Sequence, residues 1–522
     1  MYGALRFSRS STLLLAMYHR RGPMSEAKCD AIRDPSCQPA HFMHDGTMFD
    51  DRFGTYRSQC TVKRLAEPEL WVSGTLEYSP AAGAVLTVTG PAIMHDVSTY
   101  HFLHVWVEGT PLTLRNALLN WDRPSTTDSD RRQKITAEAI LHGHHTDPAA
   151  AQVQEATVEI TGLVEWADDR PMPNAGKRFE GERLFELRID ELTVSIHLKS
   201  ESVTNWRTSH QTRQAGLHIT ADSVATIGRV EELAEWFRIL LTFLTGEEQV
   251  LESLSMETPG GTCLLVSKPR NPERPDIESR QRTGARFSLL GDDASRVVEN
   301  WFKRRDDFKI AAELVSLCWL GAGMLTPFDF VALAQAAEGL DRRLHPGSDT
   351  YMSEPDYEQV ACTLISAIPS VPSALRQSLK KRLQFGNQFS LRRRLRRLRL
   401  LVPDEVRTET PIGHTGWVDD IVNLRNDLTH RPLGYREPDG QLYINSSARL
   451  SLLMQSVMLA TVGVRGHHIE RALMWTAAWG TARLTDPVDG NIRPRGRELE
   501  CPKDAVSKEL DANATARADD GD

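Results

Sequence analysis

The spacing of apolar residues changes once along this 522-residue chain, near Arg229. Before that point, from about Leu70 to Lys199, short β-rich runs alternate with turn signals, and Ser79–Gly83 joins two of them as a predicted hairpin. The runs that we expect to be strands are 70–78, 84–89, 100–107, 158–160, 184–189 and 192–198. Many short strands separated by turns favour an antiparallel sandwich or a barrel-like sheet.

After Arg229 apolar residues recur every three or four positions, as on one face of a helix. The pattern covers Leu233–Leu244, Phe330–Leu344 and Trp417–Leu428, and a long helix from Leu450 is expected to reach Trp475. Three prolines among charged residues in 268–276 are typical of a linker. The sequence therefore predicts a two-domain α+β protein, with a β-rich sandwich or barrel-like domain at 42–275 and an all-α bundle at 285–482. Segments 1–41 and 486–522 are expected to be a disordered leader and tail.

Charge and cysteine content narrow the class of protein. The net charge of −8 argues against a protein that coats nucleic acid with its whole surface, although it leaves room for a local basic patch. Seven scattered cysteines without a Cys-x-x-Cys pair fit a reducing compartment, so we expect a cytoplasmic protein. No apolar stretch is long enough to span a bilayer, and we expect no membrane partner.

A helix is predicted from Trp417 to His430, and it carries the polar groups most suited to chemistry. Thr415 is placed to cap its start, and Pro432 disfavours helical geometry beyond His430. His430 then lies at the helix C-terminus, where the dipole favours a protonated ring. Asn426 lies one turn earlier on the same face, and Arg425 borders the buried stripe.

An arginine, an amide and an imidazole at one edge of a bundle suit RNA cleavage. The imidazole of His430 can take the proton of a 2′-hydroxyl or give one to the leaving oxygen. The guanidinium of Arg425 can bind the phosphate through two hydrogen bonds and stabilise its growing charge. Because the 2′-hydroxyl is an internal nucleophile, we expect no metal and no cofactor, and a 2′,3′-cyclic phosphate as the product.

A second feature is a basic stretch between Arg376 and Arg399, which holds ten Lys or Arg residues and no acid. On a net-acidic protein, an unbalanced basic face indicates a phosphate backbone as partner, and the alternatives are a solvated face or one paired with acids from elsewhere in the chain. The residues expected to contact RNA are Lys380, Lys381, Arg382, Arg392, Arg393, Arg394, Arg396 and Arg397.

The segment Asn423–His430 resembles the signature of HEPN domains, in which an arginine and a polar residue precede a histidine. Phe330–Leu344 and Phe385–Leu395 resemble the HEPN domain of ApeA-like anti-phage proteins, and Gly46–Phe49, Val72–Tyr78 and Leu86–Gly90 resemble the ApeA N-terminal domain. The resemblance covers roughly residues 42–475. It implies an abortive-infection ribonuclease that acts as a homo-oligomer paired through its HEPN domains and that a phage-derived trigger activates.

Carried over onto this chain, the family motif falls on Arg425, Asn426 and His430. Glu338 is a further catalytic candidate that would orient the arginine, and the alternative is a surface ion pair with Arg342, four residues later. The β-rich half is the natural candidate for sensing and restraint.

Rival interpretations remain open at the level of sequence. The alternative interpretation of His430 is a C-capping residue of a core helix. A HEPN protein that binds RNA or senses phage without cutting is the alternative function. A second Arg-x₄-His spacing, Arg213 to His218, leads toward a strand and we interpret it as a decoy. His142, His144 and His145 form a loop cluster that we interpret as surface residues in preference to a metal site.

Overall fold

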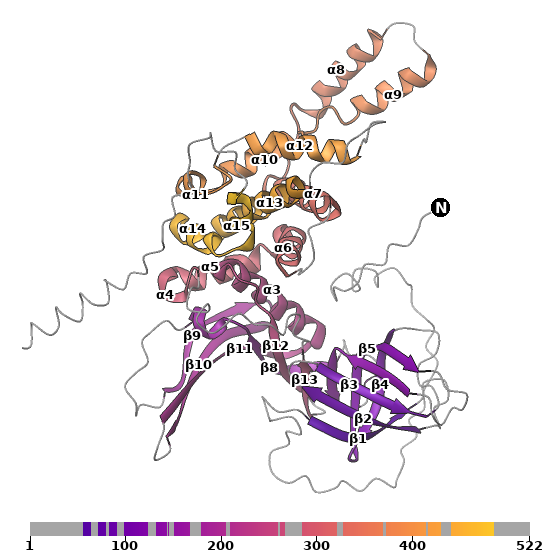
Figure 1. The fold of residues 1–522 in the computed structure, drawn as a ribbon. Coiled ribbons are helices and arrows are strands. Elements are labelled where there is room, and N and C mark those ends of the chain that lie inside the picture. Colours follow the sequence, from indigo (N-terminus) through magenta and orange to yellow (C-terminus); the bar gives the residue numbers. More distant parts are fainter. Residues whose placement is uncertain are drawn as a thin grey trace, which may run out of the picture. The chain divides into compact units, whose positions relative to one another are not determined.

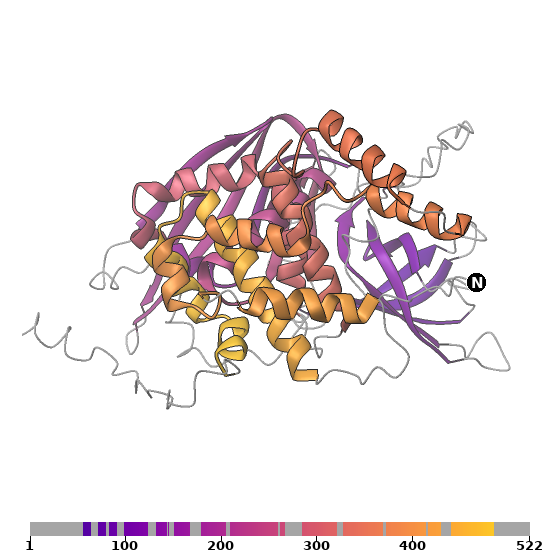
Figure 2. The same ribbon diagram turned by 90° about the horizontal axis from the view of Figure 1, so that it is seen from above.

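The computed structural model describes residues 56–63, 71–79, 83–90, 99–123, 132–143, 145, 151–167, 179–204, 209–258, 261–266, 284–320, 327–368, 372–413, 416–429 and 440–484. The expected leader, the proline-containing linker, the polar tail and His430 lie outside these ranges. Figures 1 and 2 show the chain in two perpendicular views, with strands in the first half and helices in the second.

Six of the described strands close into an antiparallel barrel, in the order β4-β1-β2-β3-β6-β5, with β5 pairing back to β4. Their bounds are β1 Tyr56–Lys63, β2 Trp71–Ser79, β3 Gly83–Thr89, β4 Thr99–Val107, β5 Thr110–Arg123 and β6 Arg132–Ala137. Alternate residues point inward and are fully buried, as Val62, Leu76, Leu86, Leu103 and Ile135 show. The predicted hairpin is confirmed in its pairing, since β2 and β3 are antiparallel neighbours.

The sheet continues from β5 into a second set of strands in the order β7-β13-β12-β8-β11-β10-β9. Their bounds are β7 Ala139–His142, β8 Gln152–Ile160, β9 Phe179–Ile189, β10 Leu192–Thr204, β11 Ser209–Thr226, β12 Leu251–Thr258 and β13 Gly261–Val266. Strands β12 and β13 return to the sheet after a helix, which the sequence pattern did not predict. A short helix, α2 (Leu163–Ala167), follows β8 and buries Trp166.

Helix α3 (Ile227–Thr245) packs on this sheet and is the first long helix of the chain (Figure 1). Thr226 caps its start by accepting a hydrogen bond from the Arg229 amide, and Gly246 ends it in a left-handed conformation at φ 75°. The helix contacts β8, β11 and β12 through one face and α5, α6, α13 and α14 through another. It is therefore apolar almost all round, as a helix enclosed by two layers must be.

The second half of the chain is helical, as expected. The bounds are α4 Phe287–Leu290, α5 Asp293–Lys303, α6 Arg305–Leu320, α7 Pro327–Leu344, α8 Glu354–Ser366, α9 Ser373–Leu383, α10 Leu391–Leu400, α11 Asp404–Glu409, α12 Gly416–Thr429, α13 Gly440–Thr461, α14 Gly466–Met474 and α15 Ala477–Leu484. Helix α13 is buried along most of its length and contacts α6, α7, α10, α12, α14 and α15. It forms the centre of the bundle.

One helix prediction was wrong. The expected run from Leu450 to Trp475 is two helices, because α13 ends at Thr461 and α14 begins at Gly466. Gly463 lies between them with φ 97°, a backbone conformation that glycine adopts readily and that residues with a Cβ atom adopt only rarely. Among the described helices, none combines the length and hydropathy needed to cross a membrane.

Candidate functional site

Helix α12 presents the candidate catalytic residues on the outside of the bundle. Its inner face consists of Trp417, Val418, Ile421 and Leu424, which are buried, and Leu428, which is partly buried. Burial of each large apolar side chain contributes roughly 1.5–3 kcal/mol, so this stripe fixes the rotation of the helix about its axis. The helix packs on α7, α10 and α13. The apolar stripe predicted from the sequence is confirmed.

Asn426 lies on the opposite side of the helix from that stripe, and Arg425, four residues after Ile421, lies at the margin of the stripe. Arg425 is half-buried and Asn426 is exposed, and the Arg425 Nη1 donates to the Asn426 Oδ1 at 3.5 Å. Within the described ranges Arg425 forms no ion pair, so its guanidinium keeps donors for a ligand. Thr429 Oγ1 donates to the carbonyl oxygens of Arg425 and Asn426 at 3.0 and 3.1 Å and so satisfies the end of the helix. His430, the residue after α12, lies outside the described residues.

Glu338 lies on α7 and takes part in ion pairs with two arginines. Its Oε1 is 3.3 Å from the Arg342 Nη2 and 3.6 Å from the Arg394 Nε. The pair with Arg342 is the alternative that the sequence left open. No ion pair joins Glu338 to Arg425 in the described part of the chain, and this geometry favours a structural role for Glu338 over a catalytic one.

Some side chains of the basic stretch are buried in the fold and others are exposed, and Arg394 is buried. Its side chain and that of Asp341 on α7 are both fully buried, with the Arg394 Nη1 3.2 Å from the Asp341 Oδ2. Arg397 contacts the same carboxylate through its Nε at 2.7 Å and is 17% exposed. The expectation that Arg394 and Arg397 contact RNA therefore needs correction, because both guanidiniums neutralise a buried carboxylate.

The other arginines of α10 lie at its surface. Arg392 and Arg396 are each within ion-pair distance of Asp419 on α12, at 2.5 and 3.7 Å. All three side chains are more than 40% exposed, so these pairs contribute little to stability. Arg393 lies over the rings of Phe389 and Tyr351, with its Cζ 3.8 and 4.8 Å from the ring centroids. These guanidiniums remain accessible to a phosphate.

Helix α9 is the most exposed basic element. No residue of α9 is buried, and Lys380, Lys381 and Arg382 in its last turn are exposed. None of the three forms an ion pair with another described residue. With α8 it forms a helical pair held by a hydrogen bond from the Tyr357 hydroxyl to the Leu383 carbonyl (Figure 1). The predicted basic face is thus present on α9 as an unpaired surface.

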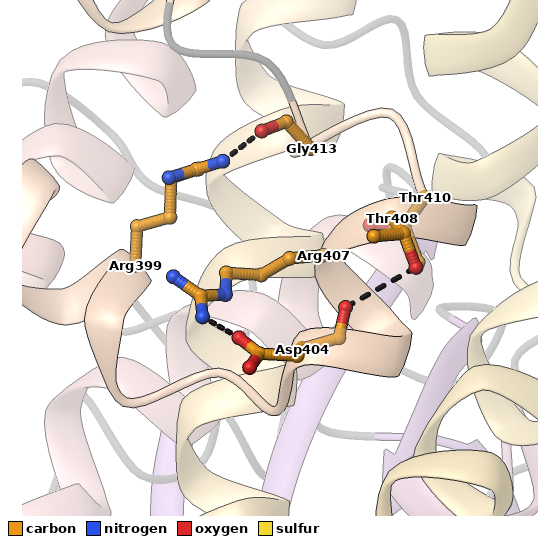
Figure 3. Close-up of a pocket in the computed structure, with 6 residues that line it drawn as sticks. All are labelled: Arg399, Asp404, Arg407, Thr408, Thr410 and Gly413. Atoms are coloured by element: carbon orange, nitrogen blue, oxygen red, sulfur yellow. Dashed lines mark hydrogen bonds and ion pairs between the residues drawn. The ribbon is translucent and has the colours of Figure 1, made fainter.

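A hollow of about 540 Å³ lies at the junction of α10, α11 and the turn that precedes α12 (Figure 3). None of its lining residues was a candidate site residue from the sequence, although Arg399 belongs to the basic stretch. Its lining residues are Arg399, Asp404, Arg407, Thr408, Thr410 and Gly413. No periodic pattern joins these residues, because they meet only through the fold of the short helix α11.

The remaining candidates from the sequence, the Arg213–His218 spacing and the loop histidines, form no second catalytic or metal site among the described residues. His218 lies on β11 inside the sheet, where its ring stacks on His197 at 4.2 Å and burial lowers its pKa. The side chain of Arg213 lies outside the described residues. Of the loop histidines, His144 and the side chain of His142 are also outside them, and the His145 amide donates to the Thr113 hydroxyl at 2.9 Å.

Comparison with known families gives two matches that follow each other along the chain. The family described as ApeA N-terminal domain 1 matches residues 65–301, and the family described as Apea-like HEPN matches residues 331–466. The first match covers β2 to β6 of the barrel, the second sheet, α3 and the start of the helical region. The second covers α7 to α13 and includes Arg425, Asn426 and His430. Comparison with curated proteins and with solved structures gave no match.

Proposed function

Because this chain has the domain composition of an ApeA-like protein with a C-terminal HEPN domain, we propose that it is an anti-phage endoribonuclease that cleaves RNA without a metal ion. The HEPN family supports a nuclease-type defence function, and the cleavage chemistry and its residues are the proposal. The observation that carries it is the accessibility of Arg425. The arginines Arg394, Arg397 and Arg399 are engaged by carboxylates or carbonyls, whereas the guanidinium of Arg425 makes one long contact, with an amide, among the residues that the structure describes.

Arg425 would bind the scissile phosphate. A guanidinium offers two parallel N–H groups that match two phosphate oxygens, and it stabilises the additional negative charge of the transition state. The contact with Asn426 leaves most of the Arg425 donors available, and it holds the guanidinium beside the amide. Asn426 would then hydrogen-bond to the same phosphate or to the ribose, since its own side chain is exposed.

His430 would move the proton. The oxygen of the 2′-hydroxyl attacks the adjacent phosphorus, the bond from phosphorus to the 5′-oxygen breaks, and a 2′,3′-cyclic phosphate remains. One imidazole removes the 2′ proton and a protonated imidazole gives a proton to the leaving 5′-oxygen, so the protons balance. Two copies of His430 from paired HEPN domains would supply both roles. We therefore propose a homo-oligomer in which the two Arg425–His430 sets face one another.

The exposed end of α9 would hold the RNA backbone. Lys380, Lys381 and Arg382 place three unpaired positive charges within one helical turn. Phosphate contacts of this kind position a nucleic acid without reading its sequence. Arg392, Arg393 and Arg396 are the further accessible cations of the basic stretch. A phage-derived trigger would control access, with the β-rich half as the sensing part.

The test is the fate of RNA in cells that express the full chain. Cells with the wild type are expected to stop growing during phage infection and to accumulate RNA fragments that end in 2′,3′-cyclic phosphates. Arg425→Ala and His430→Ala are each expected to lower cleavage by about 10²–10⁴-fold. Cleavage by purified protein is expected to persist in EDTA.

Two variants serve as matched controls. Arg471→Ala and His467→Ala remove an exposed arginine and an exposed histidine from α14, and both are expected to leave cleavage unchanged. Unchanged cleavage by Arg425→Ala and His430→Ala would disprove the catalytic assignment. RNA binding without any cleavage during infection would support a non-catalytic RNA-binding protein, and loss of cleavage in EDTA would disprove the metal-free mechanism.

A further inference from the structure

The hollow between α10 and α11 gathers cationic donors that the fold uses only in part. Arg399 enters from α10, and its Nε donates to the Ile412 carbonyl at 3.0 Å while its Nη2 donates to the Gly413 carbonyl. Arg407 enters from α11 and pairs with Asp404 through its Nη2. Figure 3 shows the Arg399 side chain reaching Gly413 and the Arg407 side chain reaching Asp404.

Several hydrogen-bond donors remain after those contacts are made. A guanidinium carries five N–H groups, and among the described residues no partner contacts the Nη1 of Arg399 or the Nε and Nη1 of Arg407. Thr410 also lines the hollow and is 7% exposed, yet its hydroxyl has no hydrogen-bond partner among the described residues. A buried hydroxyl without a partner costs roughly 1–3 kcal/mol. Rotation of the Thr410 side chain toward a ligand oxygen in the hollow would recover this cost.

The charges in the hollow favour an anion. Two guanidiniums and one carboxylate line it, and the Asp404 carboxylate is 83% exposed and therefore mostly solvated. Burial, and then the charge of Arg407, lower the pKa of Arg399. An arginine side chain is positively charged at neutral pH, so two like charges repel each other at the hollow. An anion between them would relieve this repulsion.

We propose that this hollow is a binding site for a phosphate monoester dianion, held by Arg399, Arg407 and Thr410. Its volume of about 540 Å³ is far larger than a phosphate group and lies within the range of small-molecule sites, so the ester would carry a nucleoside-sized substituent. A free mononucleotide and the 5′-phosphate end of an RNA both present this chemistry.

The site is separate from the proposed catalytic residues. Arg425 lies nine residues after Gly416, the first residue of α12, and therefore about 14 Å along the helix axis. The turn that lines the hollow, Thr410–Gly413, leads into α12. An anion bound there would join α10, α11 and that turn, and would hold the start of the helix that carries Arg425.

The experiment measures binding to the full chain in an Arg425→Ala background, so that its result does not depend on RNA cleavage. The probes are inorganic phosphate, adenosine 5′-monophosphate, and a short RNA with either a 5′-phosphate or a 5′-hydroxyl. Isothermal titration calorimetry is expected to show binding of the monophosphate. If the RNA end is the natural source, the 5′-phosphorylated RNA binds at least tenfold more tightly than the 5′-hydroxyl RNA; equal affinities assign the site to the free nucleotide.

Variants separate the hollow from the rest of the basic surface. Arg407→Gln and Thr410→Val are each expected to weaken binding of the monophosphate, the first by about tenfold or more because a charge-assisted hydrogen bond is lost. Arg376→Gln removes an exposed arginine from α9 and is expected to leave it unchanged. Thr410→Val keeps the size of the side chain, so it tests the site even if Arg407→Gln disturbs α11. No binding of phosphate or monophosphate at millimolar concentration, or equal loss with Arg376→Gln, would overturn the proposal.

Discussion

Replacement of Arg394 by methionine tests whether this arginine stabilises the fold or binds RNA. The Arg394 side chain is fully buried, and its Nη1 lies 3.2 Å from the Asp341 carboxylate. Its Nε also donates to the Phe389 carbonyl at 3.2 Å. Removal of one partner of a buried ion pair costs about 3–5 kcal/mol, because the other charge stays buried without compensation. Asp341 keeps Arg397 at 2.7 Å and His345 at 3.3 Å, so we expect the lower value, about 3 kcal/mol.

This loss is large enough to measure by thermal unfolding. For a helical region of this size, 1 kcal/mol corresponds to about 2–4 °C, so Arg394→Met should lower the Tm by about 6–12 °C. The assay is circular dichroism of the full chain, together with affinity for single-stranded RNA at several salt concentrations. The salt dependence of that affinity should stay as in the wild type, because Arg394 has no exposed surface with which to contact a phosphate.

Lys380→Met is the matched control, since it removes a positive charge from an exposed position of the same basic stretch. It should change stability by no more than about 0.5 kcal/mol and lower the salt slope of RNA binding by about 0.7. The reasoning is refuted if Arg394→Met leaves the Tm unchanged and reduces the salt slope as Lys380→Met does. That result would place Arg394 at the surface.

Three further predictions follow from the geometry. Replacement of Lys380, Lys381 and Arg382 of α9 together by glutamine should leave the circular dichroism spectrum intact and lower the salt slope of RNA affinity by about 2. An unchanged salt slope would show that α9 does not contact the RNA. Gly463→Ala should cost about 1–2 kcal/mol in chemical unfolding because of its φ of 97°, whereas Gly440→Ala, with open space around its Cβ, should cost nothing. Trp301→Phe should cost about 1–3 kcal/mol, since the indole of Trp301 donates to the Trp236 carbonyl at 3.0 Å, and equal stability of wild type and variant would contradict this.

Much of the sheet could be predicted because its strands bury one face. In β2 buried residues alternate with exposed or partly buried ones, and β3 and β10 follow the same pattern except at Val85 and Ser195, which are also buried. This period of 2 is visible without any knowledge of the partner strands. Strand β11 (Ser209–Thr226) was expected only as a strand beyond the segment from Arg213 to His218, because its sequence is largely polar, and its pairing with β10 along thirteen residues determines its conformation. Strands β12 and β13 are short, and their pairing with each other and with β8 and β7 determines their conformation. Tertiary pairing outweighed the local pattern there.

The helix that carries the candidate site could be predicted from the sequence, whereas the roles of the cations in α10 could be predicted only in part. The stripe of Trp417, Ile421 and Leu424 fixes which side of α12 faces the core, and hence the side on which Arg425 lies. In α10 the same argument was available, because Arg394 is adjacent to Leu395 and four residues before Leu398, both of which are buried. An arginine on a buried stripe requires a buried acid. The sequence could not name Asp341, which lies 53 residues away.

Buried residues from both halves of the chain form one shared core. This limits which truncations can test the proposed restraint of the nuclease by the β-rich half. A single cluster of buried residues runs from Val158 in the second sheet through α3 to Leu453 in α13, and the barrel residue Leu86 is not part of it. The stacked indoles of Trp236 and Trp301 each donate to the carbonyl of the other, and the Gln455 side chain donates to the Phe243 carbonyl.

The expected linker at 268–276 therefore does not separate two independently folded domains. A cut after Pro275 would strip α3 from the bundle and leave apolar faces of α5, α6, α13 and α14 without cover, so the lack of activity in such a fragment would say nothing about restraint. The barrel has its own interior and ends at Ala137, the last residue of β6. Removal of the barrel alone leaves the shared core in place. Deletion of the residues up to Ala137 is therefore the truncation that tests the proposed restraint of the nuclease by the β-rich half.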